Sequence, residues 1–373
     1  MKITNISAYP VELPLISYED GGLGPYITSH GEEGAARSVI VKVETTGGYV
    51  GWGEIHLVLS PHIMKVIIED EFGQKVVGMD PFDIRKILSR LRQDFSTQYF
   101  DAPAFAAGVE LACWDIAGKA TNQAVNRLFG GAIKNRIPAC YCLGIVGPDR
   151  IAERANKIIG EGYRTVKLKA GLDLDEDVER VRAVRETVGN RLNIRVDANQ
   201  SFNLLEALEF TRKVEEYDLE YLEQPIPVNN LDGFTSLRSR TKTPIAINED
   251  CYIENNIYDA VSRNSIDAAV IDYEPLGGLI RLIEVNGLAN MAGLELAHHC
   301  GFDLGIKTAA ILHGTSCLNA FSYSMDTIYF SLKDDVLKDR LDIVEGSFSV
   351  PDKPGLGVEV DMDKIEKYSL LSD

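Results

Sequence analysis

The sequence predicts an α/β fold, a (β/α)7β barrel of the TIM type with an N-terminal α+β capping domain. From Pro138 onward, short apolar runs alternate with amphipathic helical stretches, which is the pattern of βα units around a parallel sheet. The polar residues that end successive runs lie 23 to 30 positions apart, about one βα period each. A chain of 373 residues is long enough for such a barrel and a smaller second domain.

The first third of the chain mixes strand and helix patterns. Residues 1–16 alternate polar and apolar residues, which predicts a β-strand and does not fit a signal peptide. Residues 39–44 and 49–55 also alternate, with turn residues between them, so we expect a hairpin. Residues 102–120 show helical spacing of apolar residues, and Gly130-Gly131 follow. We therefore place the end of the capping domain at residue 131.

The barrel is predicted over residues 132–340, and residues 341–373 are expected to return to the capping domain. Strands are expected near positions 139, 165, 192, 220, 244, 268, 294 and 317. In a barrel of this kind, functional side chains gather at the C-terminal ends of the strands, because the βα loops open there. The last segment contains turn residues and one short strand pattern, and no catalytic pattern of its own.

Composition narrows the range of partners. Hydrophobic residues make up 45% and charged residues 25% of the chain, as in globular proteins, and the net charge of −18 repels nucleic acid and anionic membranes. The sequence has no run of about 18 apolar residues, so it predicts no transmembrane helix. The six cysteines include no CxxC pair, which favours a reducing compartment. We expect a cytoplasmic homo-oligomer that binds a small-molecule carboxylate.

Three carboxylates fall at the ends of the third, fourth and fifth predicted strands: Asp197, Glu223 and Glu249. Neighbouring parallel strands lie about 4.8 Å apart, so these groups would repel one another unless a cation lay between them. Oxygen ligands select Mg²⁺, Mn²⁺ or Ca²⁺ over zinc, and Mg²⁺ is the first choice, with one ion per subunit. A solvated strand end or an ion pair is the alternative for any single carboxylate, but three in register indicate a metal site.

Lys167 and Lys169 lie two positions apart on a predicted strand and should face the same space. Two ammonium groups beside a metal ion repel each other and the ion, so one lysine can be neutral and act as a base. Lys169 is nearer the strand end and is the better candidate. Lys167 would contact the substrate carboxylate or tune Lys169. The alternative is that one of the two lysines points into solvent.

A second base is predicted on the other side of the barrel. Asp272 ends the sixth strand and a histidine ends the seventh, and an aspartate that holds one imidazole nitrogen fixes the tautomer and strengthens the base. Adjacent strand residues face opposite ways, so only one of His298 and His299 points inward, and counting favours His299. The alternative is that the histidine is an ordinary core residue.

These residues carry a resemblance that covers nearly the whole chain. The sequence resembles the mandelate racemase subgroup of the enolase superfamily: KLK at 167–169 looks like its KxK motif, the three carboxylates fall where its metal ligands do, and Asp272 with His299 is similar to its Asp/His dyad. Residues 303–361, with YSMDT at 323–327, also look like the glucarate dehydratase branch. The resemblance implies a lysine or histidine base and an enediolate stabilised by magnesium.

The sequence also departs from parts of this family. Muconate cycloisomerases and dipeptide epimerases carry a lysine on the sixth strand, where this chain has Asp272 followed by Tyr273. Gly301 stands where glucarate dehydratases carry a polar residue. These departures disfavour both of the lysine-bearing activities and strict glucarate specificity.

The predicted reaction is removal of the proton alpha to a carboxylate, which requires strong stabilisation of the resulting dianion. If His299 lies beside a β-hydroxyl, water leaves and a sugar acid becomes a 2-keto-3-deoxy acid, which is the outcome we expect. If it faces the α-carbon, the outcome is racemisation or epimerisation of a 2-hydroxy acid or an amino acid derivative. The alternative from another class is a non-catalytic sugar-acid-binding barrel, whose mark would be a missing base or ligand.

Residues 15–34 contain five glycines and no lysine or arginine, which predicts a mobile lid. Without a cation the lid suits a monocarboxylic acid, although an ordinary surface loop is the alternative. Glu19 and Asp20 would instead attract a cationic substrate. The residues predicted to contact substrate are Asn199, Tyr18, Tyr26, His30, His298 and Asp326.

Overall fold

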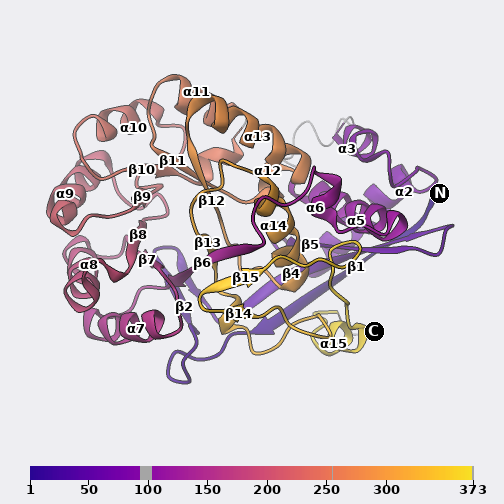
Figure 1. Cartoon of the computed structure of the whole chain (residues 1–373), viewed down its shortest axis with the longest axis horizontal. Helices are drawn as coiled ribbons and strands as arrows, with labels where there is room; N and C mark the ends of the chain where they lie inside the picture. The colour runs from indigo at the N-terminus through magenta and orange to yellow at the C-terminus, as the bar shows by residue number, and fades with distance from the viewer. Residues whose placement is uncertain (93–102, 254, 372–373) are drawn as a thin grey trace.

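The computed structural model describes residues 1–92, 103–253 and 255–371. Its N-terminal part contains an antiparallel sheet in the order β1-β4-β5 (Figure 1). The sheet strands are β1 (Ile3–Pro14), β4 (Ala35–Thr45) and β5 (Val50–His56), so the predicted hairpin is present. The segment between β1 and β4 forms a separate hairpin of β2 (Tyr26–Thr28) and β3 (Gly31–Glu33).

Helices cover this sheet. The longest, α5 (Pro103–Thr121), packs on β5 so closely that two positions of the strand require glycine. A Cβ at Gly51 would lie 2.0 Å from the Ala112 carbonyl oxygen, and one at Gly53 would lie 2.0 Å from that of Gly108. The other helical segments here are α1 (Pro61–Val66), η1 (Ile67–Phe72), α2 (Gly73–Val76), α3 (Ile84–Arg92) and α6 (Val125–Leu128).

The rest of the described chain confirms the barrel fold. Parallel pairing runs in chain order from β6 to β12, and β13 pairs with β6 to bring the last strand beside the first. The strands are β6 (Arg136–Leu143), β7 (Thr165–Lys169), β8 (Asn193–Asp197), β9 (Tyr221–Glu223), β10 (Ile245–Ile247), β11 (Ala268–Ile271), β12 (Glu295–His298) and β13 (Met325–Thr327).

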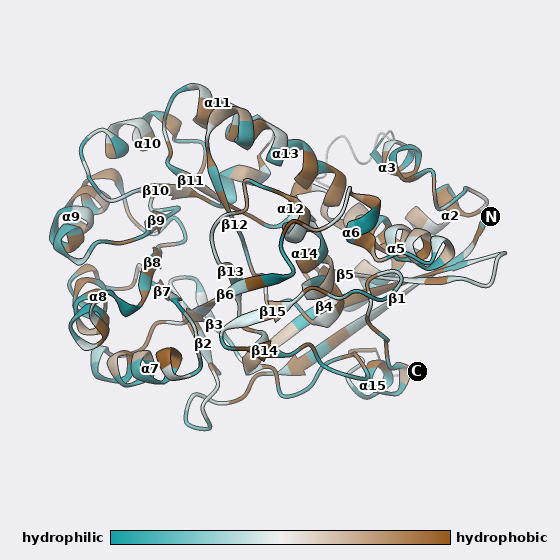
Figure 2. Ribbon diagram, in the orientation of Figure 1, coloured by the Kyte–Doolittle hydropathy of each residue, from teal (hydrophilic) through white to brown (hydrophobic). Residues whose placement is uncertain are grey.

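Helices connect these strands and surround them (Figure 1). They are α7 (Pro148–Gly160), α8 (Leu174–Val188), α9 (Leu204–Val214), α10 (Leu231–Arg238), α11 (Asn256–Ser262), α12 (Tyr273–Leu276), α13 (Leu279–Ala292) and α14 (Gly305–Cys317). The outer helices α7 and α8 carry much hydrophilic sequence, as Figure 2 shows. In the part of the chain that is described, no helix combines the length and the apolar character that crossing a membrane requires.

The eighth strand was predicted in the wrong place. Position 317 is the last residue of α14, and the strand is Met325–Thr327, inside the YSMDT sequence. The error has a physical cause, because every residue of α14 from 305 to 316 is buried. A helix that is apolar on all sides cannot be told from a buried strand by its periodicity.

The C-terminal residues lie beside the N-terminal sheet (Figure 1). After β14 (Ile343–Val344) and β15 (Ser347–Ser349), the helix α15 (Met362–Lys367) ends near β1. The Glu12 backbone N–H donates to the Tyr368 carbonyl, and the Leu370 N–H donates to the Pro10 carbonyl, each at 2.9 Å. These bonds attach the end of the described chain to β1.

Candidate active site

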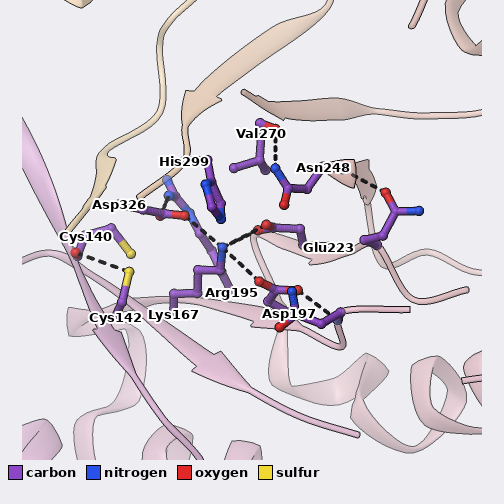
Figure 3. A network of polar contacts seen from close by, with 12 residues as sticks. Cys140, Cys142, Lys167, Arg195, Asp197, Glu223, Asn248, Val270, His299 and Asp326 are labelled. Atoms are coloured by element: carbon purple, nitrogen blue, oxygen red, sulfur yellow. Dashed lines mark hydrogen bonds and ion pairs between the residues drawn. The ribbon is translucent and has the colours of Figure 1, made fainter. Parts of the chain in front are cut away.

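Lys167 lies at the centre of a buried cluster of charges at the end of β7 (Figure 3). Its Nζ is 2.8 Å from Asp326 Oδ2, 2.8 Å from Glu223 Oε1 and 3.1 Å from Asp197 Oδ2. The strand register explains the grouping, because Lys169 pairs with Asp197 and Asp197 pairs with Glu223 across β7, β8 and β9. The two lysines and two of the predicted ligands therefore lie on neighbouring strand ends.

The protonation of this cluster differs in part from the prediction. Burial lowers the pKa of Lys167, but the charges of Asp197, Asp326 and Glu223 outweigh it and hold that pKa well above its usual range. The three carboxylates that contact Lys167 therefore favour its charged form. Burial and then the Asp197 charge raise the pKa of Glu223 well above its usual range. The charged form of Glu223 is therefore unfavourable unless a positive charge lies close to it.

Lys169 is held at the wall of a cavity. Its Nζ donates to Asp197 Oδ2 at 2.6 Å and to Asn199 Oδ1 at 2.7 Å. Asn199 follows β8 in a left-handed conformation, with φ of 44°, and its backbone N–H donates to Asp197 Oδ1 at 2.9 Å. Asn199 therefore orients both the predicted base and a predicted metal ligand.

Glu249 lies two residues beyond β10, at the start of a short 3₁₀ turn, η4 (Glu249–Tyr252). Its Oε1 accepts from Asn199 Nδ2 at 3.4 Å and from Gln200 Nε2 at 3.2 Å. Its Oε2 is buried and has no hydrogen-bond partner among the described residues. A buried, unpartnered carboxylate oxygen fits a ligand to a hard divalent cation.

The two histidines after β11 point in different directions. His299 lines the cavity, whereas His298, the last residue of β12, is 1% exposed and lies near Tyr273 and Phe321. His298 Nδ1 lies 2.7 Å from the His299 carbonyl oxygen. The expectation that His298 contacts substrate is wrong, because successive side chains of a strand alternate between its faces.

Asp272 and His299 are neighbours as predicted, but their contact is longer than a hydrogen bond. The Asp272 Oδ2 is 3.8 Å from His299 Nδ1, which is too long for a hydrogen bond, and the buried Nδ1 has no partner among the described residues. The same Oδ2 accepts from Lys307 Nζ at 2.7 Å. Burial raises the pKa of Asp272, but Lys307 outweighs it and lowers that pKa. Lys307 has taken the contact that the sequence assigned to the histidine.

A cavity of about 210 Å³ joins these groups at the mouth of the barrel. Both Lys169 and His299 reach it, from β7 and from the end of β12. Residues of the N-terminal part and of the barrel together line it: Tyr26, Thr28, His56, Cys142, Lys167, Lys169, His299, Cys300, Gly301, Phe302, Asp326 and Ile328.

The predicted lid residues have three different positions. Tyr26 lines the cavity and is 2% exposed, with its ring edge-on to Phe302 at 5.3 Å. His30, between β2 and β3, places Nε2 at 2.8 Å from the Asn199 carbonyl oxygen and so attaches the hairpin to the barrel mouth. Tyr18 lies outside the cavity, where its ring is 4.1 Å from the Arg154 guanidinium carbon.

The predictions for Tyr18 and for a cation-attracting Glu19 are wrong for the same reason. Helix α7 supplies arginines that the lid sequence lacks: Arg150 forms an ion pair with Glu19, and Arg154 donates to the Tyr18 carbonyl at 2.9 Å. These contacts hold both lid residues against α7 and away from the cavity.

Asp326 on β13 lines the cavity and is also a counter-ion for two buried cations. Its Oδ2 accepts from Lys167, and its Oδ1 accepts from Arg195 Nη1 at 3.0 Å. Arg195 is fully buried and lies over the Tyr221 ring at 4.9 Å. Sequence reasoning missed Arg195, although an arginine two positions before Asp197 in a buried strand was a signal that it faces the same space.

Lys307 and His56 were also missed. Lys307 is the single charged residue in the apolar stretch 304–312, which was a signal for a buried charge with a specific partner. His56 ends β5 and lines the cavity, and burial followed by Lys307 lowers its pKa to about 4. Only the tertiary structure brings β5 to the barrel mouth, so no local pattern marked His56.

Comparison with known proteins places this site in a family. Residues 16–130 match the mandelate racemase / muconate lactonizing enzyme N-terminal domain, and residues 150–364 match the enolase C-terminal domain-like family. The chain belongs to the mandelate racemase/muconate lactonizing enzyme subgroup of the enolase superfamily. It is therefore an enzyme of a subgroup whose chemistry begins with removal of a proton from a carboxylate substrate.

Relatives in this subgroup carry out different reactions. The N-succinyl-L-Arg/Lys racemase of Bacillus cereus is 30% identical, with the match covering 100% of this chain and 99% of that protein. Its crystal structure superposes with a TM-score of 0.92 at 28% identity, over 100% of this chain and 99% of that one. The arabinonate dehydratase of Saccharolobus solfataricus is 29% identical over 90% of this chain and 91% of its own length.

A further structure contains both metal and ligand. The dipeptide epimerase of Enterococcus faecalis, complexed with Mg and the dipeptide L-Leu-L-Tyr, matches with a TM-score of 0.87 at 25% identity, over 96% of this chain and 100% of that chain. The family alone does not decide between racemisation, epimerisation, dehydration and cycloisomerisation for this chain.

Proposed function

We propose that this enzyme is a Mg²⁺-dependent racemase or epimerase of a small carboxylate, a 2-hydroxy acid or an amino acid derivative. The observation that carries the proposal is that two bases, Lys169 and His299, line one cavity from different sides of the barrel. The full-length similarity to a racemase supports it. The proposal therefore prefers racemisation or epimerisation, the alternative interpretation of the sequence, to dehydration of a sugar acid.

The metal site would be formed by Asp197, Glu223 and Glu249. A Mg²⁺ ion held by these residues would supply positive charge to stabilise an enediolate. Lys167, whose charge is fixed by three carboxylates, adds a second positive charge at the cavity. The magnesium in the E. faecalis epimerase structure is consistent with this assignment.

The two bases divide the proton transfer. Lys169 Nζ removes the α-proton from one face of the substrate, and the His299 imidazolium returns a proton to the other face. In the reverse direction His299 removes the proton and the Lys169 ammonium returns one. Asn199 and Asp197 hold the Lys169 ammonium at the cavity wall through bonds of 2.7 and 2.6 Å.

The cavity itself favours a compact substrate. Its volume of about 210 Å³ and its Tyr26, Cys142, Phe302 and Ile328 walls suit a short or apolar α-substituent better than a polyhydroxylated chain. Among the uncharged lining side chains, Tyr26, Thr28 and His56 can bond a hydroxyl or an amide.

Dehydration is the second candidate, supported by the similarity to arabinonate dehydratase and by Asp272 directly after the sixth barrel strand. In that reaction Lys169 removes the α-proton, and His299 donates a proton to the β-hydroxyl as the carbon–oxygen bond breaks. Water leaves, and the resulting enol becomes a 2-keto acid.

The test is a panel of 2-hydroxy acids, N-acyl amino acids and aldonic acids, incubated with enzyme and Mg²⁺ in D₂O. We expect loss of the α-proton NMR signal and inversion of configuration, without 2-keto acid, for a member of the first two classes. Formation of a 2-keto acid from an aldonic acid would establish dehydration instead. No exchange with any class would contradict both candidates.

A further inference from the structure

Two consecutive residues after β8 have a left-handed backbone: Asn199, with φ of 44°, and Gln200, with φ of 67°. This conformation is unfavourable for a residue with a side chain, because its Cβ approaches the following carbonyl oxygen. Such strain persists only where surrounding contacts hold the backbone in place. The Asn199–Gln200 turn therefore needs partners that keep its shape.

The turn presents both of its amide side chains to the candidate site. Asn199 Oδ1 accepts from Lys169 Nζ at 2.7 Å, and Asn199 Nδ2 donates to Glu249 Oε1 at 3.4 Å. Gln200 Nε2 donates to the same Glu249 oxygen at 3.2 Å. The placement of the predicted base and of one predicted metal ligand therefore depends on the shape of this turn.

The backbone groups of the turn have partners from both parts of the chain. Within the barrel, the Asn199 N–H donates to Asp197 Oδ1 at 2.9 Å, and the Gln200 N–H donates to the Gln224 carbonyl at 2.7 Å. From the N-terminal part, His30 places Nε2 at 2.8 Å from the Asn199 carbonyl oxygen. A carbonyl oxygen only accepts, so Nε2 carries the proton in this bond.

The β2–β3 hairpin, which carries His30, is attached on both sides of the strand that carries Lys169. After β6, the Ile145 N–H donates to the Ile27 carbonyl at 2.8 Å, and a Cβ at Gly144 would lie only 2.7 Å from the Ile27 nitrogen. His30 makes the attachment after β8. Because β7 lies between β6 and β8, the hairpin crosses the barrel mouth at the end of β7.

We infer that His30 is a positioning residue, which holds the strained Asn199–Gln200 turn and thereby orients Lys169 for removal of the α-proton. The inference rests on the proposed two-base reaction and deepens it. His299 reaches the cavity from the end of β12, on another side of the mouth. The two bases should therefore respond differently to the loss of His30.

The experiment compares two substitutions of His30. His30→Ala removes the donor, whereas His30→Gln keeps a side-chain amide that can donate to the Asn199 carbonyl. His30 is exposed, so neither change disturbs the packed core. The matched control is His62→Ala, at an exposed histidine of α1. The measurement is α-hydrogen exchange in D₂O for each enantiomer of the substrate identified in the panel, at saturating Mg²⁺ and substrate.

We expect His30→Ala to slow exchange about fivefold for the enantiomer deprotonated by Lys169, which is the one that Lys169→Ala no longer exchanges. Loss of one hydrogen bond changes a conformational equilibrium by roughly 2- to 12-fold. The other enantiomer should keep its wild-type rate, and His30→Gln and His62→Ala should keep both rates. Unchanged rates in His30→Ala, equal slowing of both enantiomers, or an equal loss in His30→Gln would overturn the inference.

A second measurement needs no substrate. Backbone amide hydrogen exchange over residues 198–202, followed by mass spectrometry, should be faster in His30→Ala than in the wild type and unchanged in His30→Gln. Unchanged amide exchange in His30→Ala would also overturn the inference. Absence of wild-type α-hydrogen exchange with either enantiomer would instead overturn the proposed function, and the amide measurement would still decide whether His30 holds the turn.

Discussion

The two sides of the barrel mouth are built in different ways. On the metal side, neighbouring strands β7, β8 and β9 place Lys169, Asp197 and Glu223 in direct register. On the histidine side, His299 faces Asp272, the residue after β11, but Asp272 is bound by Lys307 from α14, and β5 anchors the start of that helix. A site built from successive strands can be predicted from the repeated βα spacing in the sequence. A site built from a helix and a distant sheet cannot, because its contacts form only when the chain folds.

Removing either base should have the largest effect, because the proposed reaction needs both sides of the mouth. We expect Lys169→Ala and His299→Asn each to lower the racemisation rate by about 10³-fold, within the range that general acid–base groups contribute. Optical rotation or chiral chromatography measures the rate. Lys338→Ala, at an exposed lysine paired with Glu359, is the control and should keep wild-type activity. Wild-type racemisation in Lys169→Ala would show that the metal side lacks the base.

Glu249→Gln tests the metal side alone. The change removes charge next to the buried oxygen that has no partner among the described residues, so Mg²⁺ binding should weaken by about 10-fold or more. The measurement is the Mg²⁺ concentration that gives half-maximal exchange. Glu209→Gln, on the outer helix α9, is the matched control. Equal Mg²⁺ requirements in both variants would exclude Glu249 as a ligand.

Helix α14, which carries Lys307, also carries the buried His313. We expect this histidine to make the free energy of unfolding depend on pH, an effect smaller than those of the preceding variants. His313 has its pKa lowered to about 4 by burial, below the unfolded value near 6.5. The unfolded state therefore binds more protons between these values, and stability present above pH 6.5 is lost as the pH falls toward 4. The slope should reach about 1.4 kcal/mol per pH unit for this residue.

Denaturant unfolding of the wild type and His313→Gln at several pH values measures that slope. Glutamine can keep bonds like those that His313 makes to Asn126 and Leu356, but it does not titrate. The variant should therefore lose less stability than the wild type over this interval. Identical slopes would show that another group is responsible.

The same contrast explains what the sequence could predict. The period of polar residues located the three carboxylates, the two lysines and the barrel, and strand alternation favoured His299 over His298. The eighth strand was misplaced because α14 is buried on all sides. The Asp272–His299 pair was located, but Lys307, 35 positions after Asp272, was not predicted to contact the same oxygen. Contacts between residues on distant elements depend on tertiary packing, and the spacing of residues along the sequence does not predict them.

The central claim is that Lys169 and His299 act on opposite faces of one α-carbon, and single-enantiomer exchange tests it most directly. Each pure enantiomer is incubated in D₂O with Mg²⁺ and either Lys169→Ala or His299→Asn. We predict that each variant keeps exchange with one enantiomer only, and that the enantiomer retained differs between the two. Loss of exchange with the same enantiomer in both variants would contradict the two-base arrangement.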